Sequence, residues 1–296
     1  MTSTRSVARR GLAFYLIAVV ALSTPLQIGI IRTDAFTAVG SSIAWLTGLM
    51  LVPTIASVIA RVSQSEGFAD LRLRRGHHVG RALTIAVVHP FLVGALAYGA
   101  AWLTGLTRLQ IPPLGMWAAL FTTMLVLNTV LSTGEELGWR GYMLPHMVAA
   151  GLPSPVLVSS LVWGLWHVPL FLWGGLVQDG PHPVVTTGLM LMTTIASGYI
   201  LGRLRLDSGN VWPSALLHIV WNTVIQTGFT PATSGADKAL WTGETGILTV
   251  LALTVAALAY RYWRPLNDPQ PEETPLGLPK VRDDAATSAS PAAGSS

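Results

Sequence analysis

Apolar stretches of about 20 residues alternate along the chain with short connections that hold most of its charged residues. A helix of that length crosses roughly 30 Å of hydrocarbon, and lipid offers no partners to backbone N–H and C=O groups outside a helix. We therefore predict an all-α, polytopic membrane helical bundle with about eight transmembrane helices. The predicted spans are 11–31, 40–60, 82–106, 114–134, 155–173, 184–201, 211–229 and 243–263.

The cationic residues divide unevenly between alternate connections of this arrangement. Cations concentrate on the cytoplasmic side of membrane helices, so the pattern predicts an integral plasma-membrane protein with cytoplasmic N- and C-termini. The cationic residues lie in short loops and form no continuous stripe, so we expect no nucleic-acid partner. The richer side carries Arg5, Arg9, Arg10, Arg61, Arg72, Arg74, Arg75, Arg81, Arg140, Arg203, Arg205, Arg261, Arg264, Lys280 and Arg282, and the other carries Arg32, Arg108 and Lys238.

Composition supports the membrane assignment and limits the chemistry. Hydrophobic residues make up 51% of the chain and charged residues 11%, against about 25% charged in an average soluble domain. The chain has no cysteine, which excludes disulfides, thiol nucleophiles and thiolate metal sites. Its end is rich in Pro, Ala and Ser with few large apolar residues. We therefore predict a transmembrane bundle over residues 1–264 and a disordered cytoplasmic tail over 265–296.

A few polar side chains fall within or at the ends of the predicted spans. An ionisable group at the centre of a membrane helix costs about 2.5–3.5 kcal/mol and marks a functional site by default. Side chains four positions apart share a helical face, and three such pairs occur among these residues. Glu135 directly precedes the first pair, at the cytoplasmic end of the fourth span. The pairs are Glu136 with Arg140, Trp163 with His167 in the fifth span, and His218 with Asn222 in the seventh.

Other polar residues have simpler predicted roles. His89 directly precedes Pro90 inside the third span, which favours a structural role. Asn128 and Ser132 lie on the same helical face as Glu135 and are predicted to support it or to pack. The remaining histidines fall in or near predicted loops, where we expect them to be solvated. They are His77, His78, His146 and His182.

Three motifs in this order resemble a known family, the CAAX-processing and bacteriocin-processing (CPBP, or Abi) intramembrane endopeptidases. The family carries E-E-x-x-x-R, then an aromatic-x-x-x-H motif, then H-x-x-x-N, and this chain has them at 135–140, 163–167 and 218–222. Trp163 stands where the family usually has Phe, which preserves an aromatic ring. The resemblance covers about 114–226. It implies an intramembrane peptide hydrolase acting on a membrane-associated protein or peptide, including lipid-modified, CAAX-type substrates.

The resemblance suggests roles for the motif residues in activating water and stabilising an oxyanion. Glu135 would act as general base, His167 would orient the water, and His218 with Asn222 would donate hydrogen bonds to the oxyanion. Glu136, Arg140 and Trp163 would support this arrangement. In the favoured version no cofactor is required.

A metal-dependent version uses nearly the same residues. Glu135, His167 and His218 would form a two-histidine, one-carboxylate zinc site with an open position for water. We favour the metal-free version because these residues come from three separate helices without a zinc-type spacing. Two other classes stay open: a non-catalytic membrane scaffold or bacteriocin-immunity protein, and a proton-coupled transporter.

Overall fold

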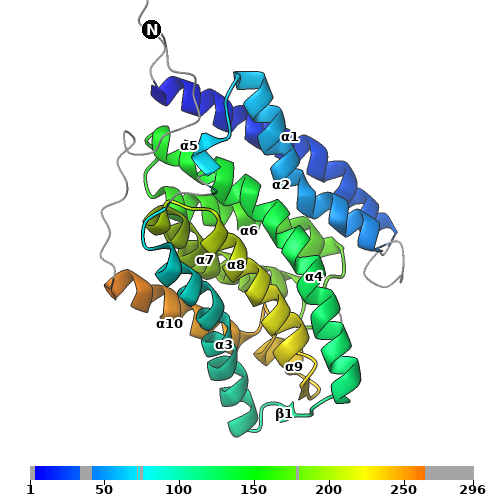
Figure 1. Ribbon diagram of the computed structural model, residues 1–296. Helices are drawn as coiled ribbons and strands as arrows, with labels where there is room; N and C mark the ends of the chain where they lie inside the picture. The colour runs from blue at the N-terminus through cyan, green and yellow to red at the C-terminus, as the bar shows by residue number, and fades with distance from the viewer. Residues whose placement is uncertain (1–3, 34–41, 72, 74–75, 178–179, 264–296) are drawn as a thin grey trace, which may run out of the picture.

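The computed structural model describes residues 4–33, 42–71, 73, 76–177 and 180–263, which fold into a bundle of long helices (Figure 1). The predicted tail over 265–296 lies outside the described residues. The long helices are α1 (Thr4–Arg32), α2 (Ser42–Gln64), α3 (Val79–Leu103), α4 (Leu114–Gly138), α6 (Pro155–Trp173), α7 (Pro183–Ser208), α8 (Trp212–Trp221) and α10 (Ile247–Trp263). The short elements are η1 (Ala69–Leu71), β1 (Arg108–Leu109), η2 (Trp139–Met143), α5 (Leu144–Ala149), η3 (Asn222–Phe229), β2 (Thr233–Ser234) and α9 (Lys238–Trp241).

The predicted polytopic helical bundle is confirmed. Within the described residues, six helical runs are long and apolar enough to cross a membrane, and α10 is a shorter apolar helix. The predicted seventh span is α8 followed directly by η3, a π-helix. Pro213 lies in the first turn of α8, where its missing N–H has no helical partner to lose.

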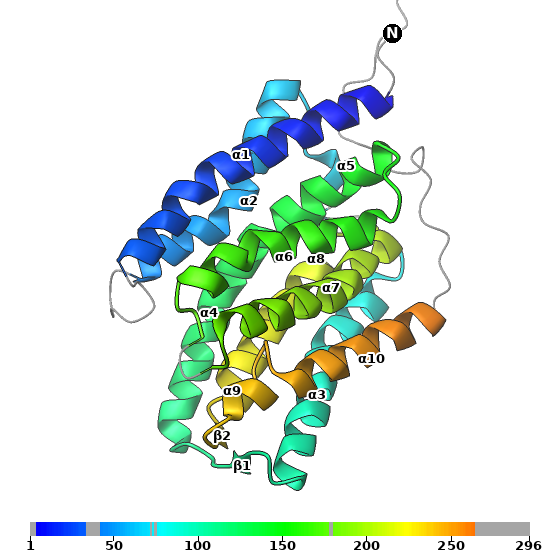
Figure 2. The same cartoon turned by 180° about the vertical axis from the view of Figure 1, so that it is seen from behind.

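The helices are arranged with the motif-bearing elements at the centre. In Figure 2, α1 and α2 lie together along one edge, and α3 and α10 lie along the opposite edge. Between these pairs, α6 packs on α7 and α4 packs on α8. The short strands β1 and β2 pair antiparallel and join the connection before α4 to the segment after η3. The four central helices therefore carry the three sequence motifs.

The fourth span is longer than predicted. We expected it to end at residue 134, but the helix continues through η2 and α5 as one run, Leu114–Ala149. Arg140 and Glu136 bind each other inside the bundle, so these charges do not need to leave the membrane helix to reach water. Glu135 and Glu136 thus lie within the helix and not at its cytoplasmic end.

Four cations that we assigned to cytoplasmic connections are buried in the protein. Arg61 and Arg140 are 1% exposed, Arg203 is 2% exposed and Arg205 is 4% exposed. Arg61 pairs with Asp70 and Arg203 pairs with Asp207. The predicted orientation therefore depends, within the described residues, on exposed cations. They include Arg5, Arg9, Arg10, Arg81 and Arg261.

Candidate active site

Glu136 is the centre of a buried charged network. Its Oε1 accepts a hydrogen bond from Arg140 Nη1 at 2.7 Å, as the four-residue spacing predicted. The same oxygen accepts a second hydrogen bond from His218 Nδ1 at 2.9 Å, a link between α4 and α8 that the sequence did not indicate. The Arg140 guanidinium lies 4.4 Å from the centre of the Trp163 ring. Glu136 and Arg140 therefore hold α4, α6 and α8 in a fixed relation.

Glu135 is held by a neutral donor instead of a cation. Its Oε2 accepts a hydrogen bond from the Trp163 indole Nε1 at 2.9 Å, and the residue is 2% exposed. The Trp163 ring centre lies 5.5 Å from that of His167 and 5.4 Å from that of His218. One indole thus contacts the carboxylate and both imidazoles that the motifs singled out.

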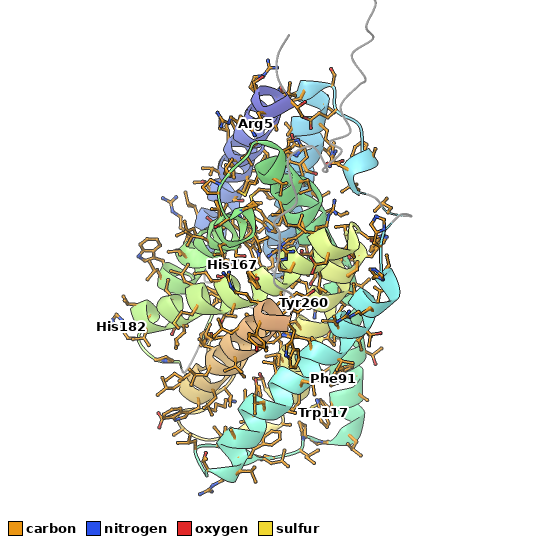
Figure 3. All side chains as sticks on the ribbon, turned by 90° about the vertical axis from the view of Figure 1, so that its left-hand side faces the viewer. Arg5, Phe91, Trp117, His167, His182 and Tyr260 are labelled. Carbon is orange, nitrogen blue, oxygen red and sulfur yellow. The ribbon has the colours of Figure 1, made fainter. Side chains whose placement is uncertain are left out.

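His167 has one ring nitrogen bound by its own helix. Its Nδ1 donates to the backbone carbonyl of Trp163 at 2.9 Å. This bond leaves Nε2 as an acceptor when the imidazole is neutral. His167 lies deep among the helices, in contrast to Arg5 and His182 near the ends of the molecule (Figure 3). It therefore offers a lone pair in the interior of the bundle.

Asn222 and Asn128 link α4 to the helix that carries His218. Asn222 Nδ2 donates to Ser132 Oγ at 3.2 Å, and Asn128 Nδ2 donates to Thr223 Oγ1 at 3.2 Å. Asn128 and Ser132, predicted to support the site, thus anchor the first residues of η3. The two hydrogen bonds fix the position of Asn222 relative to Glu135.

A cavity of about 580 Å³ brings the predicted catalytic residues together. Glu135, His167, His218 and Asn222 all line it, as does Trp163. One part of the wall is apolar, and its residues include Leu46, Leu49, Met50, Leu170, Phe171 and Met190. Another part is polar and contains residues that the motifs did not indicate: Gln226, Thr230, Lys238 and Glu244. The only sequence signal for Glu244 was an isolated carboxylate at the start of a predicted span.

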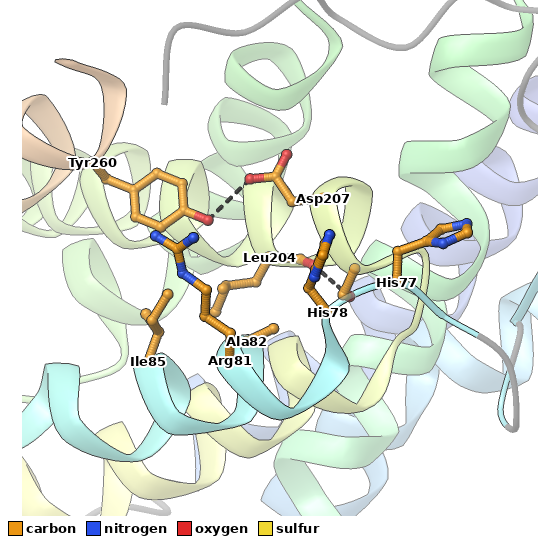
Figure 4. Close-up of a pocket in the computed structure, with 9 residues that line it drawn as sticks. His77, His78, Arg81, Ala82, Ile85, Leu204, Asp207 and Tyr260 are labelled. Carbon is orange, nitrogen blue, oxygen red and sulfur yellow. Dashed lines mark hydrogen bonds between the residues drawn. The ribbon is translucent and has the colours of Figure 1, made fainter. Parts of the chain in front are cut away.

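A second hollow, of about 20 Å³, lies between α3, α7 and α10 (Figure 4). It is lined by His77, His78, Arg81, Asp207 and Tyr260 among others. A space of this volume holds about one water molecule. It is too small for a peptide, so the larger cavity is the candidate active site.

The histidines expected in solvent divide into two groups. His77, His78 and His182 are exposed, as predicted. The prediction for His146 is wrong, because it is fully buried in α5. Its Nδ1 donates to the backbone carbonyl of Tyr142 at 2.8 Å, and its Nε2 donates to Glu66 Oε2 at 3.1 Å. The continuation of the fourth span to Ala149 carries His146 into the bundle.

The proposed zinc ligands can be compared with the geometry that a metal requires. Among the residues that the structure describes, no three His, Asp or Glu side chains gather closely enough to hold a metal ion. Glu135, His167 and His218 share a cavity, and each imidazole is held at Nδ1 with Nε2 uncommitted, but the three groups do not converge on one point. In this arrangement they do not fit a zinc site, and we derive no step through a metal.

Part of the chain matches a known protein family. Residues 116–224 match the family model described as type II CAAX prenyl endopeptidase Rce1-like. No curated protein matches the chain. The matched segment contains every predicted site residue and stops before Gln226, Lys238 and Glu244. The match confirms the resemblance of this segment to the CAAX protease (CPBP) family of intramembrane endopeptidases.

Proposed function

We propose that the chain hydrolyses a peptide bond in a membrane-associated protein or peptide with a water molecule activated by Glu135. One observation carries this proposal. Glu135, His167, His218 and Asn222, from three motifs on separate helices, line a single cavity in the bundle. Hydrolysis needs a base for water and donors for the developing oxyanion, and these four side chains supply both.

In the first step, Glu135 takes a proton from water while the water oxygen attacks the scissile carbonyl carbon. His167 Nε2 accepts a hydrogen bond from the same water, because its Nδ1 is already bound to the Trp163 carbonyl. His218 is held at Nδ1 by Glu136, and in its cationic form it has a second N–H at Nε2. This N–H and the Asn222 amide donate to the oxyanion.

In the second step the tetrahedral intermediate collapses and the C–N bond breaks. Protonated Glu135 returns its proton to the departing amine nitrogen, which leaves a carboxylic acid product and the original carboxylate. Trp163 Nε1 stays within reach of Glu135 Oε2 throughout. The buried Glu136–Arg140 pair has a positioning role, because Glu136 holds the His218 ring and neither residue lines the cavity.

The wall of the cavity indicates the kind of substrate. Its apolar part comes from α2, α6 and α7, and apolar surface of this kind suits a membrane-embedded segment or a lipid-modified chain end. We therefore propose a membrane-associated substrate, including CAAX-type proteins that carry a lipid. The protein would lie in the plasma membrane with both termini in the cytoplasm.

The proposal is tested with purified protein in liposomes and a library of quenched fluorescent peptides. Glu135→Gln and His167→Ala are compared with wild type, and Asp237→Asn serves as control because Asp237 is exposed and does not line the cavity. We expect cleavage by wild type and the control, and its loss in the two site variants. Equal rates in all four proteins would contradict catalysis and favour a scaffold or immunity role.

Two further experiments test the metal-dependent version and the transporter alternative. Exhaustive chelation should leave the cleavage rate unchanged, and a loss that zinc restores would contradict the metal-free version. Proton-coupled flux in liposomes without peptide cleavage would point to a transporter instead.

A further inference from the structure

The carboxylates of the described residues divide by the charge of their partners. Four that are buried or nearly so bind a basic side chain: Glu66 with His146, Asp70 with Arg61, Glu136 with Arg140 and Asp207 with Arg203. Asp237 is exposed. Glu135 and Glu244 differ from all of these, because their hydrogen-bond donors are neutral and both side chains line the large cavity.

Glu244 is held firmly at this position. Its Oε1 accepts a hydrogen bond from Trp221 Nε1 at 3.1 Å, and Gln226 lines the same cavity. Its backbone carbonyl accepts from Thr193 Oγ1 at 2.7 Å. Trp221 directly precedes Asn222 in the chain, so the carboxylate is fixed to the same helix that carries two of the proposed catalytic residues.

Glu244 has no ion-pair partner among the described residues, although His218 lines the same cavity and its positive charge favours the ionised carboxylate. Neutral donors offset less of the cost of burying a carboxylate than a cation does. Glu244 lies in the connection before α10, and burial raises the pKa of its carboxyl. Lys238 also lines the cavity, but it is exposed on α9 and forms no ion pair with Glu244. A cation that entered the cavity would give Glu244 a direct ion-pair partner.

We propose that Glu244 determines specificity by binding a lysine or arginine side chain of the peptide substrate, near the bond that is cleaved. This inference rests on the proposed endopeptidase function. Glu244 lies outside the segment that matches the family model, so the match to the family does not itself predict this preference. With Glu135 as the base, the cavity then has one carboxylate for chemistry and one for recognition.

The test uses matched peptides that differ at one position near the scissile bond, with Lys, Gln or Glu at that position in turn. Hydrogen bonds to charged groups are worth enough to change affinity by about tenfold or more. We therefore expect that, at one of the positions tested, wild type cleaves the Lys peptide with a kcat/KM about tenfold above that of the matching Gln peptide. Glu244→Gln should abolish this preference yet cleave the Gln peptide as fast as wild type.

Three further proteins sharpen the result. Glu244→Asp keeps the charge and should retain a preference for Lys, and Glu244→Lys should favour the Glu peptide. Asp237→Asn removes an exposed carboxylate from the neighbouring segment and should leave the peptide ranking unchanged. Thermal unfolding of each variant establishes that it is folded.

An identical ranking of the peptides by wild type and Glu244→Gln would overturn the inference. So would an equal loss of Lys and Gln peptide cleavage in a folded Glu244→Gln protein. If wild type cleaves no peptide, the proposed function fails, and binding of fluorescent Lys and Gln peptides to wild type and Glu244→Gln decides the recognition separately. Equal affinities there would reject a cation site at Glu244.

Discussion

Two buried clusters in this bundle share the same pairing of a carboxylate and a histidine, but of their four residues only His218 lines the large cavity. Glu136 binds His218 at 2.9 Å beside the large cavity, whereas Glu66 binds His146 at 3.1 Å in closed packing. Both ring nitrogens of His146 are bound to protein acceptors. His218 has only Nδ1 committed to Glu136 and lines the cavity.

This difference separates a pair with a structural role, Glu66–His146, from a pair beside the proposed reaction site, Glu136–His218. A buried ionisable pair in a membrane protein is expensive and invites a functional interpretation. In the Glu66–His146 pair, the second His146 nitrogen also bonds within the protein, and Arg61 and Asp70 form a further ion pair nearby. Access to space and an uncommitted ring nitrogen, rather than the pair itself, are what indicate chemistry.

The largest effect should come from Glu135→Gln, which removes the base but keeps the shape of the side chain. General-base catalysis typically contributes about 10²–10⁴ in rate, so kcat should fall by that factor while the thermal unfolding temperature stays near that of wild type. Single-turnover peptide cleavage measures the rate. A variant that retains wild-type kcat would show that Glu135 is not the base.

Glu66→Gln changes the Glu66–His146 pair and should lower stability instead of activity. Breaking one partner of a buried ion pair costs about 3–5 kcal/mol because the other charge is left uncompensated, so the free energy of unfolding should fall by about that amount. Denaturant titration in detergent measures this change. The cleavage rate per folded molecule should be unchanged, and a fall in kcat as large as that of Glu135→Gln would erase the distinction between the clusters.

The smallest effect is expected for Trp163→Phe. This change removes the indole hydrogen bond to Glu135 and keeps a ring between the imidazoles. A hydrogen bond to a charged group contributes about 1.5–3 kcal/mol, part of which water in the cavity replaces, so kcat should fall by about tenfold or less. Trp102→Phe is a suitable control, because Trp102 donates to Thr233 Oγ1 and does not line the cavity. Equal losses in both variants would contradict a specific role for the indole.

Local spacing in the sequence predicted the parts of the site that lie on single helices. The pairing of Glu136 with Arg140 and the contact of Trp163 with His167 follow from one helical turn, and both are present. The structure brings residues of all three motifs to one cavity. Their chemical roles stay a prediction.

The spacing of residues along the sequence could not predict the contacts between different helices. The sequence treated Glu135 and Arg140 as the end of a span, because charges usually stop a membrane helix. In the folded bundle Glu135 accepts a hydrogen bond from Trp163, and Arg140 forms an ion pair with Glu136. His146 was misplaced for the same reason, since its partner Glu66 is 80 positions away in the chain. No sequence pattern indicated a role for Glu244, because its hydrogen bond with Trp221 and its place in the cavity wall depend on the folded structure.

The wide π winding of η3 has a consequence for the shape of the cavity wall. His218, Asn222, Gln226 and Thr230 all line the cavity at intervals of four residues. Four residues overshoot an α-helical turn of 3.6 by about 40°, so in a regular helix this row would wind away from the opening within three steps. The broader turns from Asn222 to Phe229 absorb the excess rotation. A row of polar side chains thus continues along the cavity wall from the proposed oxyanion donors to Thr230.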